Sequence, residues 1–505
     1  MSDGGTDWRR RLLESARLEP ESGAPVDPLH WPGYSGRQAV RWGHAQLGKV
    51  RVVVAAWDFG VQGGSFGERD ATAFLAAVDA AVAEHLPLVS LLRSGGTRLQ
   101  EGMAALVGMP RATLGIRRLA AAGVLHVAVA DQPTTGGVWV TIGSRADIRA
   151  AVQGAVVGFA GPRVVEAVTG ALPARDGAGA SHTAAAAADA GLVDALLAPD
   201  EVRPWLVRTL AALAPAPQPA PPARLGELSR PTEPAEADDS RAAADGWEVA
   251  ADGWEQVERS RTRPQPSGAE LLAALVPGGV PLITADGTVA ARVGHLAGRA
   301  GQPEPPGQAG SASPAAPEPV IGVAVAAQRG GAPTVAGLGL LTRAARLADK
   351  LQLPLVTLVD TPGADPSPAQ ENAGIAAAIG VAMDAVLACS SPTVAVLHGE
   401  GGSGGALAAA CTDRVLVTTR AYFAALGPEG AAVTLRRPAP EAMRLMGVRP
   451  DDLLGLGFAD AVIEPGSEGA AVARVLTDLA SVTTDRLAAR QRRWSQPLPG
   501  HVTDT

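Results

Sequence analysis

The amino-acid sequence predicts an α/β protein made of two tandem domains that arose by internal duplication. Matched landmarks are the first observation: residues 86–92 resemble residues 353–359, 267 positions later, and residues 191–195 resemble residues 457–461, 266 positions later. The second is that apolar runs of strand length alternate with helix-forming segments in both halves. The third is length, because 505 residues exceed what one hydrophobic core normally holds.

The duplication sets the expected domain boundaries. We expect a first domain over residues 1–213 and a second over residues 251–505, joined by a linker over residues 214–250. This linker is rich in proline and alanine and has few large apolar residues, so it cannot bury enough surface to order itself. Residues 301–319 have a similar composition and are expected to form a surface loop.

The first domain is expected to alternate strands, glycine-rich loops and helices around a mainly parallel sheet. Expected strands are residues 50–56, 86–92 and 125–130, and residues 71–83 should form a helix. The second domain repeats this order. Its expected strands are residues 320–326, 355–360, 393–397, 415–418 and 421–425, and its expected helices are residues 339–351, 369–387, 440–447, 451–456 and 481–495.

Composition and charge exclude several classes of function. The net charge is −8 and no basic run is present, which argues against nucleic acid or an anionic membrane as a partner. Cys389 and Cys411, the only cysteines, cannot form a disulfide framework or a four-cysteine zinc site, so no metal is expected. The N-terminus lacks the apolar core of a signal peptide and no apolar run reaches ~18 residues. The sequence therefore predicts a cytoplasmic protein without a membrane span.

The strongest local signal is a glycine-rich turn in the second half. The expected strand over residues 393–397 leads into five glycines within seven residues, from Gly399 to Gly405, and then into an alanine-rich helix. Glycine lets a ligand approach the backbone, and the first amides of the helix lack intrahelical partners. The turn is therefore suited to bind an oxyanion or a phosphate, although a plain packing turn is the alternative.

Two phosphate-binding motifs do not explain this turn. A Walker loop ends in Gly-Lys-Ser/Thr, whereas Gly405 is followed by Ala406 and Leu407. The Gly-x-Gly-x-x-Gly pattern of dinucleotide-binding folds is present, but Thr418-Thr419-Arg420 stands where the acidic residue is expected. The first half carries a matching turn at Thr135-Gly136-Gly137, which indicates one turn in each domain.

These motifs together resemble a known family, the carboxyltransferase component of acetyl-CoA carboxylase and related acyl-CoA carboxylases. Residues 50–210 are similar to its β half and residues 250–465 to its α half, fused here in one chain. The motifs that carry the resemblance are Ser94-Gly95-Gly96-Thr97-Arg98-Leu99-Gln100-Glu101-Gly102, Gly158-Phe159-Ala160-Gly161-Pro162-Arg163-Val164, Asp360-Thr361-Pro362-Gly363-Ala364, Gly399 to Leu407, and Pro428-Glu429-Gly430-Ala431-Ala432. The resemblance implies a crotonase fold in both domains.

The resemblance also implies a reaction. Such enzymes move a carboxyl group from carboxybiotin, held by a partner carrier, to the α-carbon of an acyl-CoA, as in the conversion of acetyl-CoA to malonyl-CoA. Biotin and a coenzyme A thioester are thus the implied cofactor and substrate, and a biotin carboxylase and a biotin carboxyl carrier protein are the implied partners. The only lysines are Lys49 and Lys350, and neither lies in a biotinylation motif.

By resemblance, backbone amides stabilise the two oxyanions of this reaction, one on the thioester and one on biotin. The implied catalytic residues are Gly136, Gly137, Gly405 and Ala406. The implied substrate-binding residues are Gly95, Gly96, Arg98, Gly402, Gly404, Ala408 and Gly430. Two features depart from the family pattern: the β half lacks a four-cysteine zinc finger, and residues 328–343 hold few cations for the phosphates of CoA.

Several residues have a structural interpretation beside the functional one. Arg98 could contact substrate or pair with Glu101 or Glu68 inside the protein. His398 could be a general base, but a core histidine is favoured because biotin itself can serve as the base. Glu400 and Glu429 resemble the paired glutamates of enoyl-CoA hydratases, yet stabilisation of their loops is favoured. Both cysteines are expected in the core.

The assembly and the alternatives complete the prediction. Because one turn from each domain must face the same substrates, we expect the site to form between the first domain of one chain and the second domain of another, in a homodimer or larger homo-oligomer. Three alternatives remain open. They are a malonyl-thioester decarboxylase, a biotin-independent acyl or carboxyl transferase, and a non-catalytic carboxylase subunit.

Overall fold

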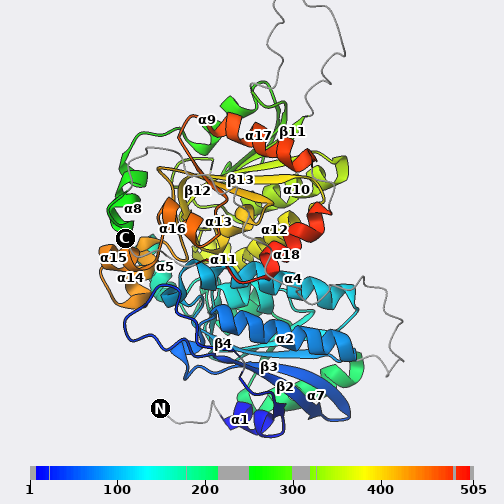
Figure 1. The fold of residues 1–505 in the computed structure, drawn as a ribbon. Helices are drawn as coiled ribbons and strands as arrows, with labels where there is room; N and C mark the ends of the chain where they lie inside the picture. The colour runs from blue at the N-terminus through cyan, green and yellow to red at the C-terminus, as the bar shows by residue number, and fades with distance from the viewer. Residues whose placement is uncertain are drawn as a thin grey trace, which may run out of the picture.

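The computed structural model of the chain describes residues 7–21, 23–177, 179–213, 250–297, 319–325, 327–481 and 485–500. Within these residues the chain forms two eight-stranded sheets, each covered by helices (Figure 1). The predicted linker and the predicted loop over residues 301–319 lie almost entirely outside the described residues.

The first sheet has the strand order β1-β2-β3-β4-β5-β6-β8, with β7 paired to the end of β5. Strands β1 and β2 pair antiparallel at one edge, β2 pairs antiparallel with β3, and all later pairs are parallel. The strands are β1 (Arg17–Leu18), β2 (Val40–Leu47), β3 (Val50–Trp57), β4 (Leu88–Ser94), β5 (His126–Thr135), β6 (Ile148–Val152), β7 (Val157–Gly158) and β8 (Ala195–Leu197).

The second sheet repeats this topology strand for strand, in the order β9-β10-β11-β12-β13-β14-β16 with β15 beside β13. Even the register shift between β4 and β5 recurs between β12 and β13. The strands are β9 (Val280–Leu282), β10 (Val289–Gly294), β11 (Val320–Val325), β12 (Leu355–Thr361), β13 (Thr393–Gly402), β14 (Arg414–Thr418), β15 (Tyr422–Ala424) and β16 (Ala461–Ile463). The predicted duplication into two α/β domains is confirmed.

Helices surround the first sheet on both faces. They are α1 (Asp7–Glu14), α2 (Glu68–Glu84), α3 (Met103–Leu106), α4 (Gly108–Ala121), α5 (Pro162–Thr169), α6 (Ala184–Asp189) and α7 (Val202–Leu213), with a π-helical turn η4 (Trp139–Gly143) after β5 and short 3₁₀ turns η2 (Gln62–Gly64), η3 (Leu99–Glu101) and η5 (Pro199–Glu201). Helix α2 starts where Asp70 accepts the amide of Gly67 and ends at His85 in the left-handed region.

Helices of the second domain are α8 (Gly253–Thr262), α9 (Gly268–Leu275), α10 (Val335–Leu351), α11 (Pro368–Asn372), α12 (Ile375–Ala388), α13 (Ser403–Ala410), α14 (Pro428–Leu435), α15 (Ala439–Leu445), α16 (Pro450–Gly455), α17 (Glu468–Ser481) and α18 (Arg486–Ser495). The single helix predicted over residues 369–387 is two helices, because Gly374 takes a left-handed φ of +86° and separates α11 from α12.

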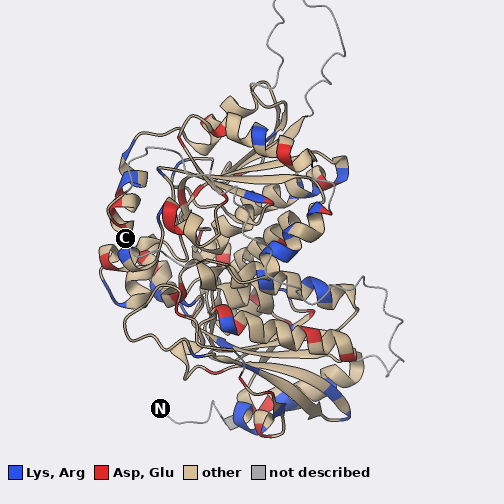
Figure 2. Cartoon of the chain, viewed as in Figure 1, with Lys and Arg blue, Asp and Glu red and all other residues tan. Residues whose placement is uncertain are grey.

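The two domains are joined by helix packing and polar contacts. Helix α4 packs on α12 and α18, and α5 packs on α14. Figure 2 shows basic residues on both α18 and the facing α4. Arg111 of α4 donates to the carbonyl of Ser495 in α18 at 3.3 Å, and Arg117 of α4 binds Asp384 of α12 at 3.0 Å. The C-terminal helix therefore lies at the domain contact rather than free on the surface.

Two negative findings concern the described part of the chain. None of its helices is long and apolar enough to cross a membrane. Within the same residues, no group of three or more His, Cys, Asp or Glu side chains could hold a metal ion, and both cysteines are buried.

Candidate active site

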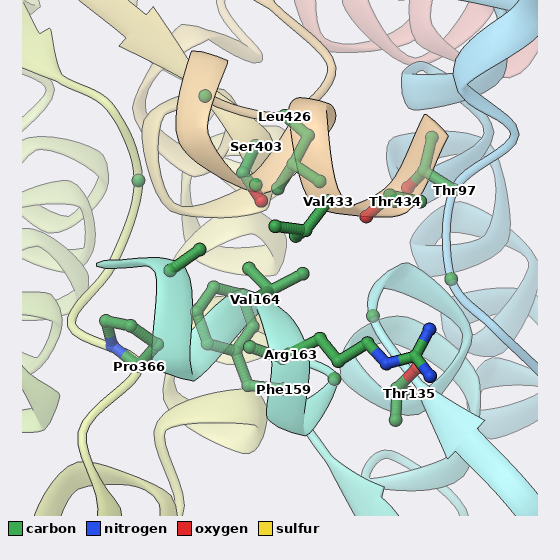
Figure 3. A pocket seen from close by; sticks show the side chains of 18 of the residues that line it. Thr97, Thr135, Phe159, Arg163, Val164, Pro366, Ser403, Leu426, Val433 and Thr434 are labelled. Atoms are coloured by element: carbon green, nitrogen blue, oxygen red, sulfur yellow. The ribbon is translucent and has the colours of Figure 1, made fainter. Parts of the chain in front are cut away.

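One large cavity, about 1690 Å³ in volume, lies between the two domains. Its lining includes Gly136 and Gly137 of the first glycine turn together with Ser403 and Gly404 of the second. The wall is completed by α5 of the first domain and α14 of the second, which face each other in Figure 3. A single chain lines this cavity with both turns. The sequence-based expectation that the two turns come from different chains of an oligomer stays a prediction.

The first turn presents the amide of Gly137 rather than that of Gly136. Gly136 has a left-handed φ of +68° and donates its N–H to the carbonyl of Phe159 at 3.0 Å. Its own carbonyl accepts the amide of Val140, so the helix begins at Gly137. The Gly137 amide is among those that have no intrahelical partner. The predicted role of Gly136 as a donor is thus corrected to one of shaping the turn.

A second amide of this turn comes from Thr97, which the sequence did not single out. The neighbours of Thr97 are used in a bridge to Phe66: Phe66 donates to the carbonyl of Gly96, and Arg98 donates to the carbonyl of Phe66. The Thr97 amide between them has no hydrogen-bond partner among the described residues. A Cβ on Gly136 would lie 2.7 Å from Gly96 Cα and 3.6 Å from Thr97 N, so the absence of a side chain lets the two backbones meet.

In the second domain the corresponding residues are shifted by one from those predicted. Strands β5 and β13 begin 267 residues apart, which aligns Ser403 with Gly136 and Gly404 with Gly137. Ser403 indeed has a left-handed φ of +57°, as Gly136 does. The predicted pair Gly405 and Ala406 thus lies one position after the residues that align with Gly136 and Gly137. Ala406 is the first helical residue whose amide can reach the carbonyl of the N-cap, Gly402.

The amide of Ala364 is the second donor of this turn. It follows β12 as Thr97 follows β4, and it has no hydrogen-bond partner among the described residues. A Cβ on Gly405 would lie 2.4 Å from Ala364 N and 2.9 Å from Ala364 Cβ. Gly405 therefore packs directly on the Ala364 backbone, and its own amide is also free of an intrahelical partner.

Met109 links the two turns across the domain contact. A Cβ on Gly404 would lie 2.5 Å from Met109 Cε, and a Cβ on Gly137 would lie 3.0 Å from Met109 Cγ. This buried side chain of α4 thus contacts both turns at once. A methionine suits the position because its flexible thioether fills irregular gaps.

The other predicted residues divide into those that line the cavity and those that do not. Gly95, Gly96, Gly404 and Gly430 line it. Gly402 and Ala408 are buried and lie outside its lining, as do Gly405 and Ala406. Ala408 is fully buried in α13 and packs in the core, so its side chain does not reach the cavity as the predicted substrate-binding role requires.

Arg98 is corrected in the same way. Its side chain is 0% exposed and absent from the cavity lining. It binds Asp70 at 2.5 Å and Glu101 at 3.4 Å, and it also donates to the carbonyl of Arg37 at 2.9 Å. Asp70 lies near the start of α2 and in turn accepts three backbone amides, two from the start of β2 and one from the residue before α2. The structural alternative for Arg98 therefore holds.

The lining has an apolar and a basic component. Phe159, Val164, Leu426 and Val433 face the space between α5 and α14 (Figure 3). Basic residues outnumber acidic ones; the former are Arg93, Arg163, Arg175, Arg261, Arg329, Arg436 and Arg437, and the latter are Glu400 and Glu429.

Arg261 forms ion pairs with both glutamates of the cavity. It binds Glu400 and, at 2.7 Å, Glu429. Burial raises the pKa of Glu400 despite this partner. Burial alone would also raise the pKa of Glu429, but the hydrogen bonds from Arg261 bring it below the usual value. The two carboxylates are thus held by one arginine, which agrees with the loop-stabilising role.

His398 lies in the core behind the second turn. It is 4% exposed, does not line the cavity, and its Nε2 atom has no partner among the described residues. Burial, and then the charge of Arg329, lowers its pKa to about 4. At neutral pH this histidine is therefore uncharged and lies outside the cavity lining, so the core interpretation is supported.

Comparison with known proteins adds independent information. Residues 42–245 match a family model described as carboxyl transferase domain, and residues 327–495 match one described as acetyl co-enzyme A carboxylase carboxyltransferase-like. The acetyl-coenzyme A carboxylase carboxyl transferase subunits beta/alpha of Saccharopolyspora erythraea is 33% identical over 503 residues, which cover 93% of this chain and 82% of that protein.

Two further matches are a second sequence relative and a solved structure. A probable biotin-dependent acyl-coenzyme A carboxylase beta3 subunit of Mycobacterium tuberculosis is 33% identical over 435 residues, covering 84% of this chain and 80% of that protein. Among solved structures, the transcarboxylase 12S hexamer with methylmalonyl-coenzyme A matches with a TM-score of 0.37 and 21% identity, covering 94% of this chain and 90% of that one.

Proposed function

The chain belongs to the carboxyltransferase family of acetyl-CoA and acyl-CoA carboxylases, and we propose that it transfers a carboxyl group from carboxybiotin to the α-carbon of acetyl-CoA or a close homologue. One observation carries this proposal: two glycine turns, one from each duplicated domain, line a single cavity. A reaction that develops negative charge on two substrates needs two such sites.

Each turn offers two amides from different segments. In the first domain they belong to Gly137 and Thr97, and in the second to Gly404 or Gly405 and Ala364. Fixed N–H donors stabilise an oxyanion strongly because they need not reorganise as the charge develops. One donor of each pair sits at a helix N-terminus, where the helix dipole also favours negative charge. We assign one pair to the thioester oxygen and the other to biotin.

The residues present fit biotin as the second substrate. When bound, carboxybiotin supplies the carboxyl group and a ureido nitrogen that can accept the α-proton. The chain then needs no acidic or basic side chain for the proton step, which agrees with the buried, uncharged His398 and with the pairing of Glu400 and Glu429 to Arg261. The cavity exceeds the roughly 300–1,000 Å³ of most single-ligand pockets, which supports space for two substrates.

Arginines at the cavity mouth suit the phosphates of coenzyme A. Arg163 of α5, Arg175 and Arg436 line the cavity, are exposed and have no ion-pair partner among the described residues. Arginine binds phosphate oxygens through several N–H groups at once. Segments outside residues 328–343, a range with few cations, can thus supply most of the positive charge. The apolar side chains between α5 and α14 provide a surface for the acyl chain.

The proposed partners follow from what the chain lacks. Lys49 and Lys350 are the only lysines and neither lies in a biotinylation motif, which supports a proposal in which biotin arrives on a separate carrier protein loaded by a biotin carboxylase. We also propose that the chain assembles as a homodimer or larger homo-oligomer in the cytoplasm.

The test uses the purified chain with malonyl-CoA, propionyl-CoA and free biotin. A carboxyltransferase converts malonyl-CoA and biotin to acetyl-CoA and carboxybiotin, and then converts carboxybiotin and propionyl-CoA to biotin and methylmalonyl-CoA. We expect methylmalonyl-CoA only when biotin is present. Acetyl-CoA and CO₂ without biotin would identify a decarboxylase, biotin-independent methylmalonyl-CoA would identify the other transferase, and no turnover would indicate a non-catalytic subunit.

A further inference from the structure

Glu371 places a buried carboxyl group at the contact between the domains. It belongs to the short helix α11 of the second domain and is 3% exposed. Its Oε2 atom accepts the amide of Phe159 at 2.8 Å and lies 3.3 Å from His182 Nε2. Both of these partners belong to the first domain, so Glu371 acts across the domain contact.

A single further hydrogen bond connects Phe159 to the first glycine turn. The carbonyl of Phe159 accepts the amide of Gly136 at 3.0 Å, and the preceding strand β7 pairs with the end of β5. Gly158 makes the approach of Glu371 possible, because a Cβ there would lie 3.0 Å from both Glu371 Cδ and His182 Cδ2. Glu371 thus binds the amide of the same residue, Phe159, whose carbonyl holds Gly136 in the turn.

We propose that Glu371 is a positioning residue, which holds the first domain's glycine turn in place from the second domain through Phe159 and Gly136. The proposal rests on the proposed function, since it concerns the turn that presents Gly137 and Thr97. Its consequence is that this oxyanion site is complete only when the second domain is docked on the first.

In the part of the chain that the structure describes, the hydrogen bond that Glu371 makes across the domain contact is found at the first glycine turn and not at the second. In the second domain, Ala425 occupies the position that Phe159 has in the first, because β15 pairs with β13 as β7 pairs with β5. No side chain within the described residues accepts a hydrogen bond from the Ala425 amide. The hydrogen bond from the neighbouring domain therefore supports the first turn and has no counterpart among the described residues at the second.

The same helix offers a matched control. Asn372, next to Glu371, also crosses the domain contact and donates from Nδ2 to the carbonyl of Ala180 at 2.9 Å. It has no hydrogen bond to the strand that holds the turn. Glu371→Ala removes the acceptor for Phe159, Glu371→Gln keeps an oxygen that can accept, and Asn372→Ala removes an interdomain bond of similar length elsewhere.

The first readout is steady-state kinetics of biotin-dependent carboxyl transfer in the full chain. We expect Glu371→Ala to lower kcat roughly tenfold to a hundredfold, because small misplacements of catalytic groups cost rates of this order. The KM for malonyl-CoA should change much less, and Glu371→Gln and Asn372→Ala should stay close to wild type. Equal losses in Glu371→Ala and Asn372→Ala, or a Glu371→Gln loss as large as that of Glu371→Ala, would overturn the proposal.

The second readout needs no activity. Amide hydrogen exchange of peptides covering residues 133–142 should be faster in Glu371→Ala than in wild type, Glu371→Gln or Asn372→Ala. Gly158→Ala should give the same local change, since its Cβ displaces Glu371, and it replaces Glu371→Ala if that variant does not fold. If the wild-type protein shows no carboxyl transfer but Glu371→Ala still exchanges faster at these residues, only the proposed function is contradicted. If exchange is unchanged in both Glu371→Ala and Gly158→Ala, the positioning role is contradicted.

Discussion

Adding a side chain at Gly405 is the most direct test of the proposed oxyanion site of the second domain. A Cβ there would meet the Ala364 amide nitrogen at 2.4 Å, so Gly405→Val must push one of the proposed donors away. Loss of one donor in an oxyanion site costs roughly 10²–10³ in turnover. We expect a loss of this size in carboxyl transfer, while melting and sedimentation show a protein that is still folded and assembled.

Gly339 provides the matched control for Gly405. It is exposed on α10, and a Cβ there would meet nothing within 4 Å. Gly339→Val should therefore keep wild-type turnover. A Gly405→Val protein with turnover near that of Gly339→Val would refute the oxyanion assignment.

His398 should tolerate truncation far better. Because it is buried, uncharged at neutral pH and outside the cavity lining, His398→Ala removes packing but no reacting group. We expect a turnover loss much smaller than that of Gly405→Val in the same assay. A larger loss would move the chemistry to the histidine and favour a hydrolase or hydratase reaction.

Glu371 should also make stability depend on pH. Burial raises its pKa from the usual 4.5 to about 8, so the folded protein holds this proton more tightly than the unfolded chain. Its contribution to stability is fully present below about pH 4.5 and is lost as the pH rises through about 8. Glu371→Gln has no such proton, so its melting temperature should fall less than that of wild type over this range.

The exposed Glu166 on α5 is the control for this measurement. Glu166→Gln should follow the wild-type curve of melting temperature against pH. Parallel curves for wild type and Glu371→Gln would show that the Glu371 carboxyl does not titrate as its burial predicts.

At the scale of elements, Arg98 fastens the loop after β4 to the start of α2. Its guanidinium pairs with Asp70 and Glu101, and all three side chains are buried. Removing one partner of a buried ion pair leaves an uncompensated charge and typically costs about 3–5 kcal/mol. Arg98→Ala should therefore lower the free energy of unfolding by about this amount in denaturant titration.

An exposed ion pair provides a control for the effect of Arg98 on stability. Arg118 of α4 binds Asp79 of α2 at the surface, where ion pairs contribute about 1 kcal/mol at most. Arg118→Ala should thus change stability little. If Arg98→Ala were as stable as Arg118→Ala but inactive, the role of Arg98 would return to substrate binding.

At the scale of the whole molecule, one chain supplies both turns to one cavity. Gly137→Val and Gly405→Val each disable a different turn. If every site lies within one chain, mixing the two inactive variants restores no activity, because each chain still carries one damaged turn. We expect this result after the two proteins are unfolded and refolded together.

The mixing experiment also has a clear opposite outcome. If sites formed between the first domain of one chain and the second domain of another, mixed oligomers would contain some sites with two intact turns. Carboxyl transfer in the mixture, with sedimentation confirming mixed assemblies, would therefore restore the arrangement first expected from the sequence.

Local features of the sequence determined the two α/β domains and the existence of one glycine turn in each. Strand and helix periodicity, and the need for glycine where backbones meet, depend on neighbours along the chain. The duplicated landmarks, such as residues 86–92 and 353–359, coincide with equivalent strands β4 and β12. The exposed or buried state of Arg98, in contrast, was left open between two interpretations.

Only the tertiary structure decided which atoms meet. The one-residue shift from Gly405 to Gly404 follows from strand register, which glycine spacing alone does not fix. The amides of Thr97 and Ala364 carry no side-chain signal, and Met109 and Glu371 act on glycines far away in the sequence. Such contacts depend on how two folded domains pack against each other, and that packing is a property of surfaces assembled from distant segments rather than of any single stretch of the chain.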